Sequence, residues 1–166
     1  MWIIYGDHGE AFGQHPGNYA HTFFIYEENV HVPFLIAAPG AIHSQIRVRK
    51  VVSLVDTAPT VLDLAGLTIQ DPYQGRSMLD GGLAPEPRMA LFFTDYSLPL
   101  LGLRDGPWKF IYRLDTRRPK LFNLDRDPGE QTDLAREYAE RVAWYEQVVR
   151  NWSASQRDYA AVNRGP

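Results

Sequence analysis

The sequence predicts an α/β fold that ends in a small antiparallel sheet packed on a C-terminal helix. Three observations support this prediction. A continuous apolar run near the start of the chain stops at a glycine-flanked turn, several short strand patterns follow in the second half, and an apolar stripe at helical spacing occupies the last part. The predicted division is residues 1–88 for the α/β region, 89–152 for the sheet and helix, and 153–166 for a polar tail that frays.

The first element is a strand over residues 2–5. We expect it to be buried, because a continuous apolar run with β-branched residues suits a sheet covered on both faces. Gly6 and Gly9 flank the next two side chains and allow a sharp turn close to a ligand. Asp7 and His8 would then lie beyond the carboxyl end of a strand, where ligands collect in open α/β sheets. Their oxygen and nitrogen atoms suit a divalent metal, but the same pair also occurs in ordinary turns.

The remainder of the first region predicts two further strands and a helix. Residues 30–37 read as an edge strand, and residues 46–52 alternate apolar and basic side chains as a half-exposed strand does. Asp56 or the next residue caps a helix that Gly66 ends, and this capping role explains the carboxylate without chemistry. Residues 68–88 are rich in Pro, Gly and Asp and predict a long connecting loop.

The second region predicts four short strands and a helix. The strands cover residues 89–94, 98–104, 108–112 and 120–124, and Asp105-Gly106-Pro107 is a hairpin signal between two of them. A helix begins near residues 132–133. Its stripe of apolar side chains, which predicts packing against the sheet, comprises Leu134, Tyr138, Val142, Tyr145, Val149 and Trp152.

Composition excludes several classes of function. The 166 residues suffice for one domain with a real core, and the net charge of −3 has no basic patch that would favour nucleic acid. The sequence has no apolar stretch long enough to span a bilayer. Without cysteine, the chain has neither disulfides nor thiolate ligands, which leaves the compartment open.

Four groups of segments follow one another along residues 1–150. They are Gly6-Asp7-His8-Gly9-Glu10 with Phe12-Gly13; Tyr26-Glu27-Glu28 with Val32-Pro33-Phe34-Leu35-Ile36; residues 52–67 with Gly75-Arg76-Ser77; and Trp108-Lys109-Phe110-Ile111-Tyr112 with Leu121-Phe122-Asn123-Leu124 and Asp127-Pro128-Gly129-Glu130. In this order and spacing they resemble the C-terminal portion of the sulfatase family, in the alkaline phosphatase superfamily. The resemblance implies the C-terminal part of an alkaline-phosphatase-like sandwich, taken from a larger enzyme or from a truncated relative.

The resemblance also implies a site. Family members cleave a sulfate or phosphate ester with a metal that binds the substrate oxygens and activates the nucleophile. Asp7 and His8 would be two of about four protein ligands, so this chain alone holds the divalent metal (Ca, Mg, Mn or Zn) weakly or not at all. A lysine or histidine in the following loop points at the ester oxygens in the family. This makes His21 and His15 the candidate catalytic residues, and the alternative for both is a solvated loop histidine.

The sequence departs from the family pattern in two ways. It contains no Cys/Ser-X-Pro-X-Arg nucleophile motif and lacks the family's first acidic ligand pair, so we expect no ester turnover by this chain alone. His8 also stands where many sulfatases have asparagine. Imidazole suits manganese, zinc or iron better than calcium. Phosphonate and phosphate-ester hydrolases of the same superfamily carry Asp-His at this place, so the resemblance implies that His8 favours phosphoester chemistry or a promiscuous site.

Three interpretations therefore stay open. The first is a fragment of a metal-dependent sulfate-ester hydrolase. The second is a phosphonate or phosphate-ester hydrolase, or a membrane-anchored phospho-group transferase, of the same superfamily. The third is a truncated, non-catalytic paralogue that acts in binding and self-associates through an exposed sheet surface. The expected partner is an ester substrate, with a periplasmic or membrane-anchored location suggested by the family.

Overall fold

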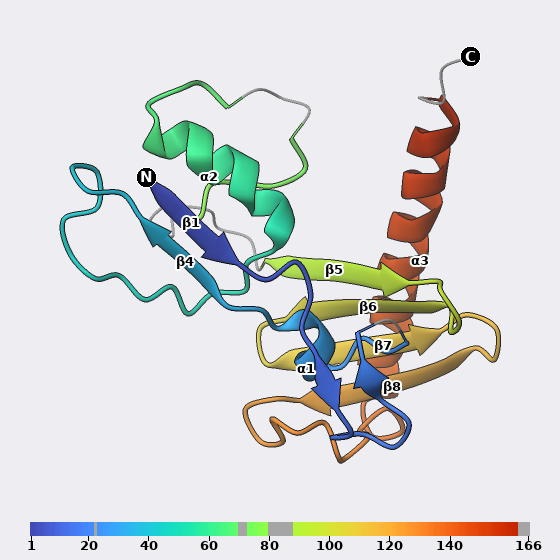
Figure 1. The fold of residues 1–166 in the computed structure, drawn as a ribbon. Coiled ribbons are helices and arrows are strands. Elements are labelled where there is room, and N and C mark those ends of the chain that lie inside the picture. The colour runs from blue at the N-terminus through green and yellow to red at the C-terminus, as the bar shows by residue number, and fades with distance from the viewer. Residues whose placement is uncertain (22, 70–72, 80–87, 163–166) are drawn as a thin grey trace.

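The computed structural model describes residues 1–21, 23–69, 73–79 and 88–162 (Figure 1). Its largest unit is a four-stranded antiparallel sheet in the order β5-β6-β7-β8. The strands are β5 Met89–Thr94, β6 Leu100–Asp105, β7 Trp108–Arg113 and β8 Arg118–Asn123, and the long helix α3 Ala139–Val162 follows them. These bounds lie within two residues of the strands that the sequence predicts, because alternating side chains and the turn at Gly106 determine them locally.

The four-stranded sheet is covered on both faces. On one face Leu103, Phe110 and Leu121 pack with Tyr145 and Val149 of α3, and all five side chains are fully buried. The opposite face carries Leu100, Ile111 and Phe122, which pack with Ile25 and Tyr26 from the first part of the chain. Side chains of successive strand residues point to opposite faces, so this one sheet contributes apolar side chains to a hydrophobic core on each face.

The first part of the chain, blue to green in Figure 1, forms small elements, several of which lie to the left of the four-stranded sheet in that view. β1 Trp2–Tyr5 pairs antiparallel with β4 Phe34–Ala37, and β2 Ala11–Phe12 pairs with β3 Tyr19–Ala20. The helices are α1 Glu27–Val30, the 3-10 turn η1 Leu54–Asp56, and α2 Thr57–Leu64. As the sequence predicts, Gly66 stops α2, whose last residue is Leu64; Gly66 takes a positive φ of 68° that a glycine adopts at little cost.

One close contact fixes the first part of the chain on the sheet. Gly102 lies in the middle of β6, and a Cβ atom built on it would lie 2.3 Å from the ring of Phe92 and 2.8 Å from Cδ1 of Ile25. Only a residue without a side chain leaves room for Ile25 here. The missing side chain at Gly102 therefore allows the segment around Ile25 to pack on the sheet.

Several predicted elements differ from the structure. β1 is not buried, since Trp2 is 75% exposed and Ile4 63% exposed, and among the described residues only β4 pairs with it. The predicted strand over 30–37 begins at Phe34, because residues 27–30 form one helical turn and Pro33 has no N–H for a strand ladder. Residues 46–52, all of them described, form no strand.

The last helix also differs from its prediction. It begins at Ala139 rather than near residue 132. Residues 135–138 form turns instead, and the carboxylates of Asp127 and Asp133 accept the backbone N–H groups of Thr132 and Ala135. It then continues to Val162, through most of the predicted polar tail, since its alanine, glutamine and arginine residues favour helix propagation. Residues 163–166 and part of the predicted loop at 68–88 lie outside the described residues. Within the described chain, no helix has the length and apolarity needed to cross a membrane.

Candidate functional site

The turn after β1 is held against α1. The N–H of Gly6 donates to the carbonyl of Pro33 at 3.2 Å, and the N–H of Gly9 donates to the carbonyl of Asn29 at 2.9 Å. A Cβ atom at position 9 would lie 2.1 Å from the carbonyl oxygen of Glu28, so only glycine fits there. This close backbone approach displays the two intervening side chains at the molecular surface.

Asp7 and His8 lie side by side on this turn, as the sequence predicts. The carboxylate of Asp7 accepts the His8 backbone N–H at 3.1 Å, and its Oδ1 lies 3.8 Å from His8 Nε2. His8 Nδ1 lies 2.9 Å from the Gly9 carbonyl, which can only accept, so Nδ1 carries the proton and Nε2 presents a lone pair. An imidazole fixed in this way through its other nitrogen is typical of metal ligands, and the oxygen and nitrogen donors fit a divalent ion.

His21 joins the same site from the end of β3. Its ring stacks on that of His8 with 4.2 Å between centroids, and its Nδ1 lies 2.9 Å from Oε2 of Glu10. Since a carboxylate only accepts, His21 also carries a proton on Nδ1. One potential ligand atom from each of His8, Glu10 and His21 lies within 4.8 Å of the others, and all three residues are exposed.

These three residues do not form a finished metal site. The rings of His8 and His21 are within 19° of parallel, so their in-plane lone pairs do not converge on one point. One ring would have to rotate before both could bind the same ion. As it stands, the arrangement leaves the Asp7 carboxylate and His8 Nε2 side by side at the surface, and it leaves Nε2 of His21 free of the hydrogen bond that its Nδ1 makes to Glu10. Sequence reasoning overlooked Glu10, whose only signal was its place in the Gly6–Glu10 motif.

His15 does not belong to this cluster. It is buried, its ring stacks on Tyr26 at 3.7 Å, its Nδ1 donates to Glu28 at 2.7 Å, and its Nε2 lies 3.2 Å from the carbonyl of Glu130. The alternative of a solvated loop histidine is therefore wrong for this residue. Burial raises the pKa of the Glu28 carboxyl, but the hydrogen bond from His15 contributes to a larger opposite effect, so that pKa lies below its ordinary value.

A buried lysine connects the α1 segment to the sheet. Lys109 is fully buried in β7, and its ammonium lies 2.9 Å from Oε1 of Glu27 and 3.6 Å from Oε1 of Glu130. Oε2 of Glu130 also accepts the backbone N–H of Glu27 at 2.6 Å. Burial raises the pKa of Glu27, but the charge and hydrogen bond of Lys109, together with the charges of Arg104 and His31, bring it below its ordinary value. Burial leaves the pKa of Glu130 above its ordinary value. These residues belong to three separate sequence motifs that meet in one charged cluster.

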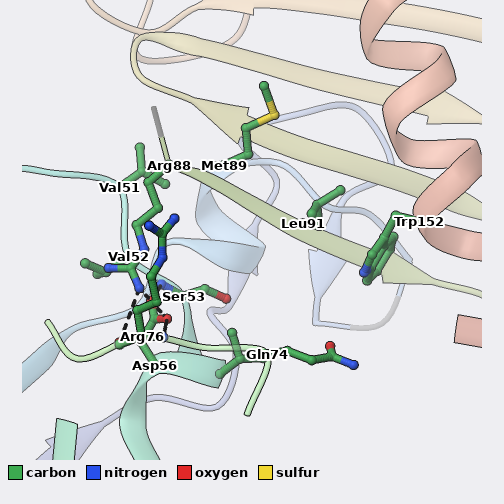
Figure 2. Close-up of a pocket in the computed structure, with 11 residues that line it drawn as sticks. Val51, Val52, Ser53, Asp56, Gln74, Arg76, Arg88, Met89, Leu91 and Trp152 are labelled. Carbon is green, nitrogen blue, oxygen red and sulfur yellow. Dashed lines mark hydrogen bonds and ion pairs between the residues drawn. The ribbon is translucent and has the colours of Figure 1, made fainter. Parts of the chain in front are cut away.

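A pocket of about 240 Å³ lies elsewhere and contains none of the predicted site residues (Figure 2). Its polar centre is Asp56, which accepts hydrogen bonds from the backbone N–H groups of Ser53 and Arg76 and pairs with the guanidinium of Arg88 at 2.5 Å. The carboxylate is 2% exposed and its acceptors are occupied. Asp56 is thus structural, as expected, although its side chain caps the 3-10 turn and binds Arg88 rather than capping α2.

Known proteins resemble the chain over almost its whole length. The family profile described as "N-sulphoglucosamine sulphohydrolase, C-terminal" matches residues 15–153. Arylsulfatase K of Mus musculus is 34% identical over 165 residues, which cover 90% of this chain and 29% of the relative. The chain therefore spans less than a third of the length of that relative.

Solved structures share the fold. A 2-O GAG sulfatase, BT1596, superposes with a TM-score of 0.76 at 24% identity, over 96% of this chain and 37% of its own. BT4656, solved in complex with its substrate D-glucosamine-2-N,6-O-disulfate, gives 0.70 at 24% identity, over 98% and 36%. The phosphonate monoester hydrolase SpPMH from Silicibacter pomeroyi gives 0.68 at 22% identity, over 94% and 34%. The predicted fold, the C-terminal part of an alkaline-phosphatase-like sulfatase architecture, is confirmed.

Proposed function

Because the chain belongs to the sulfatase family as a C-terminal portion, we propose that it contributes to a metal-dependent hydrolase of sulfate esters. The observation that carries this proposal is the meeting of Asp7, His8 and His21 on one open edge, with Nε2 of both imidazoles available. Sulfate-ester cleavage requires residues that bind a metal and a residue that contacts the anionic ester. In this proposal Asp7 and His8 bind the metal, and His21 contacts the ester.

The residues take separate roles. Asp7 and His8 Nε2 would supply two ligands to a divalent ion, which, when bound, polarises the ester oxygens. His21, held by Glu10, would present Nε2 to the sulfate and donate a hydrogen bond to an oxygen when that nitrogen is protonated. His15 would stabilise its own loop and would not contact the ester, since its two ring nitrogens face Glu28 and the carbonyl of Glu130.

Metal binding by the purified chain tests the first role. Isothermal titration with Mn²⁺ and Zn²⁺ should give weak binding that Asp7→Ala and His8→Ala each abolish, because two ligands cannot lose one and retain the ion. His43→Ala is the matched control, since His43 is also exposed and lies outside the cluster. Equal binding by the His8 variant and the wild type would count against the proposed metal pair.

Anion binding tests the second role. In ¹³C-histidine NMR spectra of the chain with metal present, inorganic sulfate should shift the His21 ring signals and leave those of His43 in place. The chain should not hydrolyse p-nitrophenyl sulfate, since it supplies no nucleophile motif. Robust metal-dependent hydrolysis, or sulfate shifts spread evenly over all histidines, would contradict the assignment.

Phosphonate or phosphate-ester hydrolysis is a second candidate. It is favoured by the nitrogen ligand of His8 beside Asp7, which suits manganese or zinc better than calcium. Titration with methyl phosphonate in place of sulfate separates the two candidates: a stronger His21 response to phosphonate, with a preference for Mn²⁺ or Zn²⁺ over Ca²⁺, would favour the phosphorus substrate.

Self-association is a separate proposal about partners. β1 and β4 expose the apolar side chains of Trp2, Ile4 and Leu35. Contiguous apolar surface of this kind favours association between copies. Light scattering of the purified chain should show a mass above 19.0 kDa at high concentration, and a monomer at every concentration would oppose this proposal.

A further inference from the structure

The two segments that carry His8 and His21 meet at one buried residue of α1. Asn29 is 4% exposed. Its backbone carbonyl accepts the N–H of Gly9, the residue after His8, at 2.9 Å. Its side-chain Nδ2 donates to the carbonyl of Ala20, the residue before His21, at 3.2 Å. A single asparagine thus makes hydrogen bonds to both neighbours of the histidine pair.

The second of these hydrogen bonds falls on a strained residue. Ala20 has a φ of 64°, in the left-handed region that residues with a Cβ atom rarely enter because the conformation is sterically strained. Surrounding contacts must therefore hold it. The Asn29 amide binds the Ala20 carbonyl, which belongs to the peptide that leads into His21, and so orients that peptide.

The other side of the amide is also occupied. Oδ1 of Asn29 accepts a hydrogen bond from Nδ2 of Asn18 at 2.7 Å, and Asn18 itself is fully buried. Position 29 must therefore donate through one atom and accept through the other, within one planar group. Aspartate has the same shape but two acceptors, so it would place an oxygen against the Ala20 carbonyl. An asparagine is the side chain that meets both requirements.

We propose that Asn29 is a positioning residue: its backbone carbonyl holds the turn of His8, and its side-chain amide holds the loop of His21, so that the two imidazoles lie together. This inference rests on the proposed function, because it assigns a support to the same cluster. Asn29 contacts neither the metal nor the ester. It places the rings of His8 and His21 through its hydrogen bonds to Gly9 and Ala20.

The variant Asn29→Asp tests the proposal in the full chain. NMR of ring-labelled histidines should show that the contacts between the His8 and His21 rings are lost, because the aspartate places an oxygen against the Ala20 carbonyl, while the Gly9 N–H keeps its bond to the backbone carbonyl of residue 29. Asn123→Asp is the matched control. Asn123 is a buried asparagine of the sheet whose Oδ1 accepts the Asp125 N–H, a bond that an aspartate can keep.

A second variant tests the route through Ala20. Glycine adopts a positive φ without penalty, so Ala20→Gly combined with Asn29→Asp should restore part of the ring contact. A merely structural role for Asn29 would lower stability without this specific recovery. A folded Asn29→Asp chain with unchanged contacts between the His8 and His21 rings would overturn the proposal.

A measurement on the unmodified chain avoids the risk that the variants unfold. The Gly9 amide should exchange with solvent far more slowly than the Asp7 amide of the same turn, because it is bonded to Asn29. A fast-exchanging Gly9 amide would overturn the proposal whatever the variants do. The ring-contact result is independent of sulfate binding, so failure of the proposed sulfate chemistry would be seen separately, as an absent sulfate response in a chain whose histidines are correctly placed.

Discussion

The two parts of the chain differ in where they place their apolar side chains. In residues 89–162, Leu103, Phe110 and Tyr145 are completely buried between the sheet and α3. In residues 1–67, Trp2 is 75% exposed and Phe12 is 78% exposed. The part that carries Asp7, His8 and His21 is therefore the part with the less complete core.

The two parts therefore differ in role: residues 89–162 supply most of the stability, and residues 1–67 carry the proposed site. The sheet and α3 have the contacts that a self-sufficient core needs, whereas the site lies on short strands and turns whose order depends on what they rest upon. Those turns rest on α1, and α1 rests on the sheet through Lys109 and Ile25. We call these contacts of Lys109 and Ile25 the junction. Through them, the stable sheet keeps the site of the first part in place.

The largest effect should come from breaking this junction. Lys109→Met leaves the half-buried carboxylate of Glu27 and the buried carboxylate of Glu130 without their cation, and should lower the free energy of unfolding by about 3–5 kcal/mol. Urea unfolding followed by fluorescence measures it. Lys50→Met, at an exposed lysine, should change stability by less than about 0.5 kcal/mol.

A compensating variant sharpens this test. Adding Glu27→Gln and Glu130→Gln to Lys109→Met removes all three charges, and should recover much of the loss because no unpaired charge is left. A Lys109→Met chain as stable as the wild type would show that the buried charges are not what joins the two parts.

Matched truncations compare the two regions directly. Leu103→Ala removes a fully buried side chain between the sheet and α3, and should cost about 2–5 kcal/mol. Trp2→Ala removes a larger but mostly exposed side chain, and should cost less than about 0.5 kcal/mol in the monomer. Thermal unfolding of both variants measures the contrast. Equal losses would mean that β1 is covered in solution by something other than the described residues, such as a second copy.

The smallest effect concerns pH. The pKa values of Glu27 and Glu28 are lowered in the folded chain, so their contribution to stability is present above the ordinary value of 4.5 and is lost as the pH falls through the lowered values. Glu130 has a raised pKa and the opposite sign, so its contribution is present at low pH and is lost as the pH rises through its folded pKa.

Stability measured between pH 7 and pH 3 checks these signs. Glu28→Gln should flatten the acid side of the profile, and Glu137→Gln, at an exposed position, should leave the profile unchanged. An unchanged profile for Glu28→Gln would mean that its bond to His15 forms equally well in the unfolded chain.

The sequence predicts best what depends on neighbours along the chain. The four sheet strands and the end of α2 at Gly66 follow from alternation and turn residues, and Asp7 with His8 follows from a glycine-flanked turn. The exposure of β1, the pairing of Lys109 and the support by Asn29 join residues far apart in sequence. No local pattern reports such contacts, which is why the sequence predicted a buried β1 and predicted no role for Lys109 or Asn29.

The vacant position at Gly102 has a consequence for exchanging parts between relatives. Ile25 enters the sheet where β6 has no side chain, and Phe92 closes the same space. A C-terminal half transplanted from another family member would accept this N-terminal half only if its second strand left the same gap. Even one added methyl group would displace Ile25, and with it the α1 turn on which both histidines depend. Interchangeability of the two halves is therefore decided at a residue far from the chemistry.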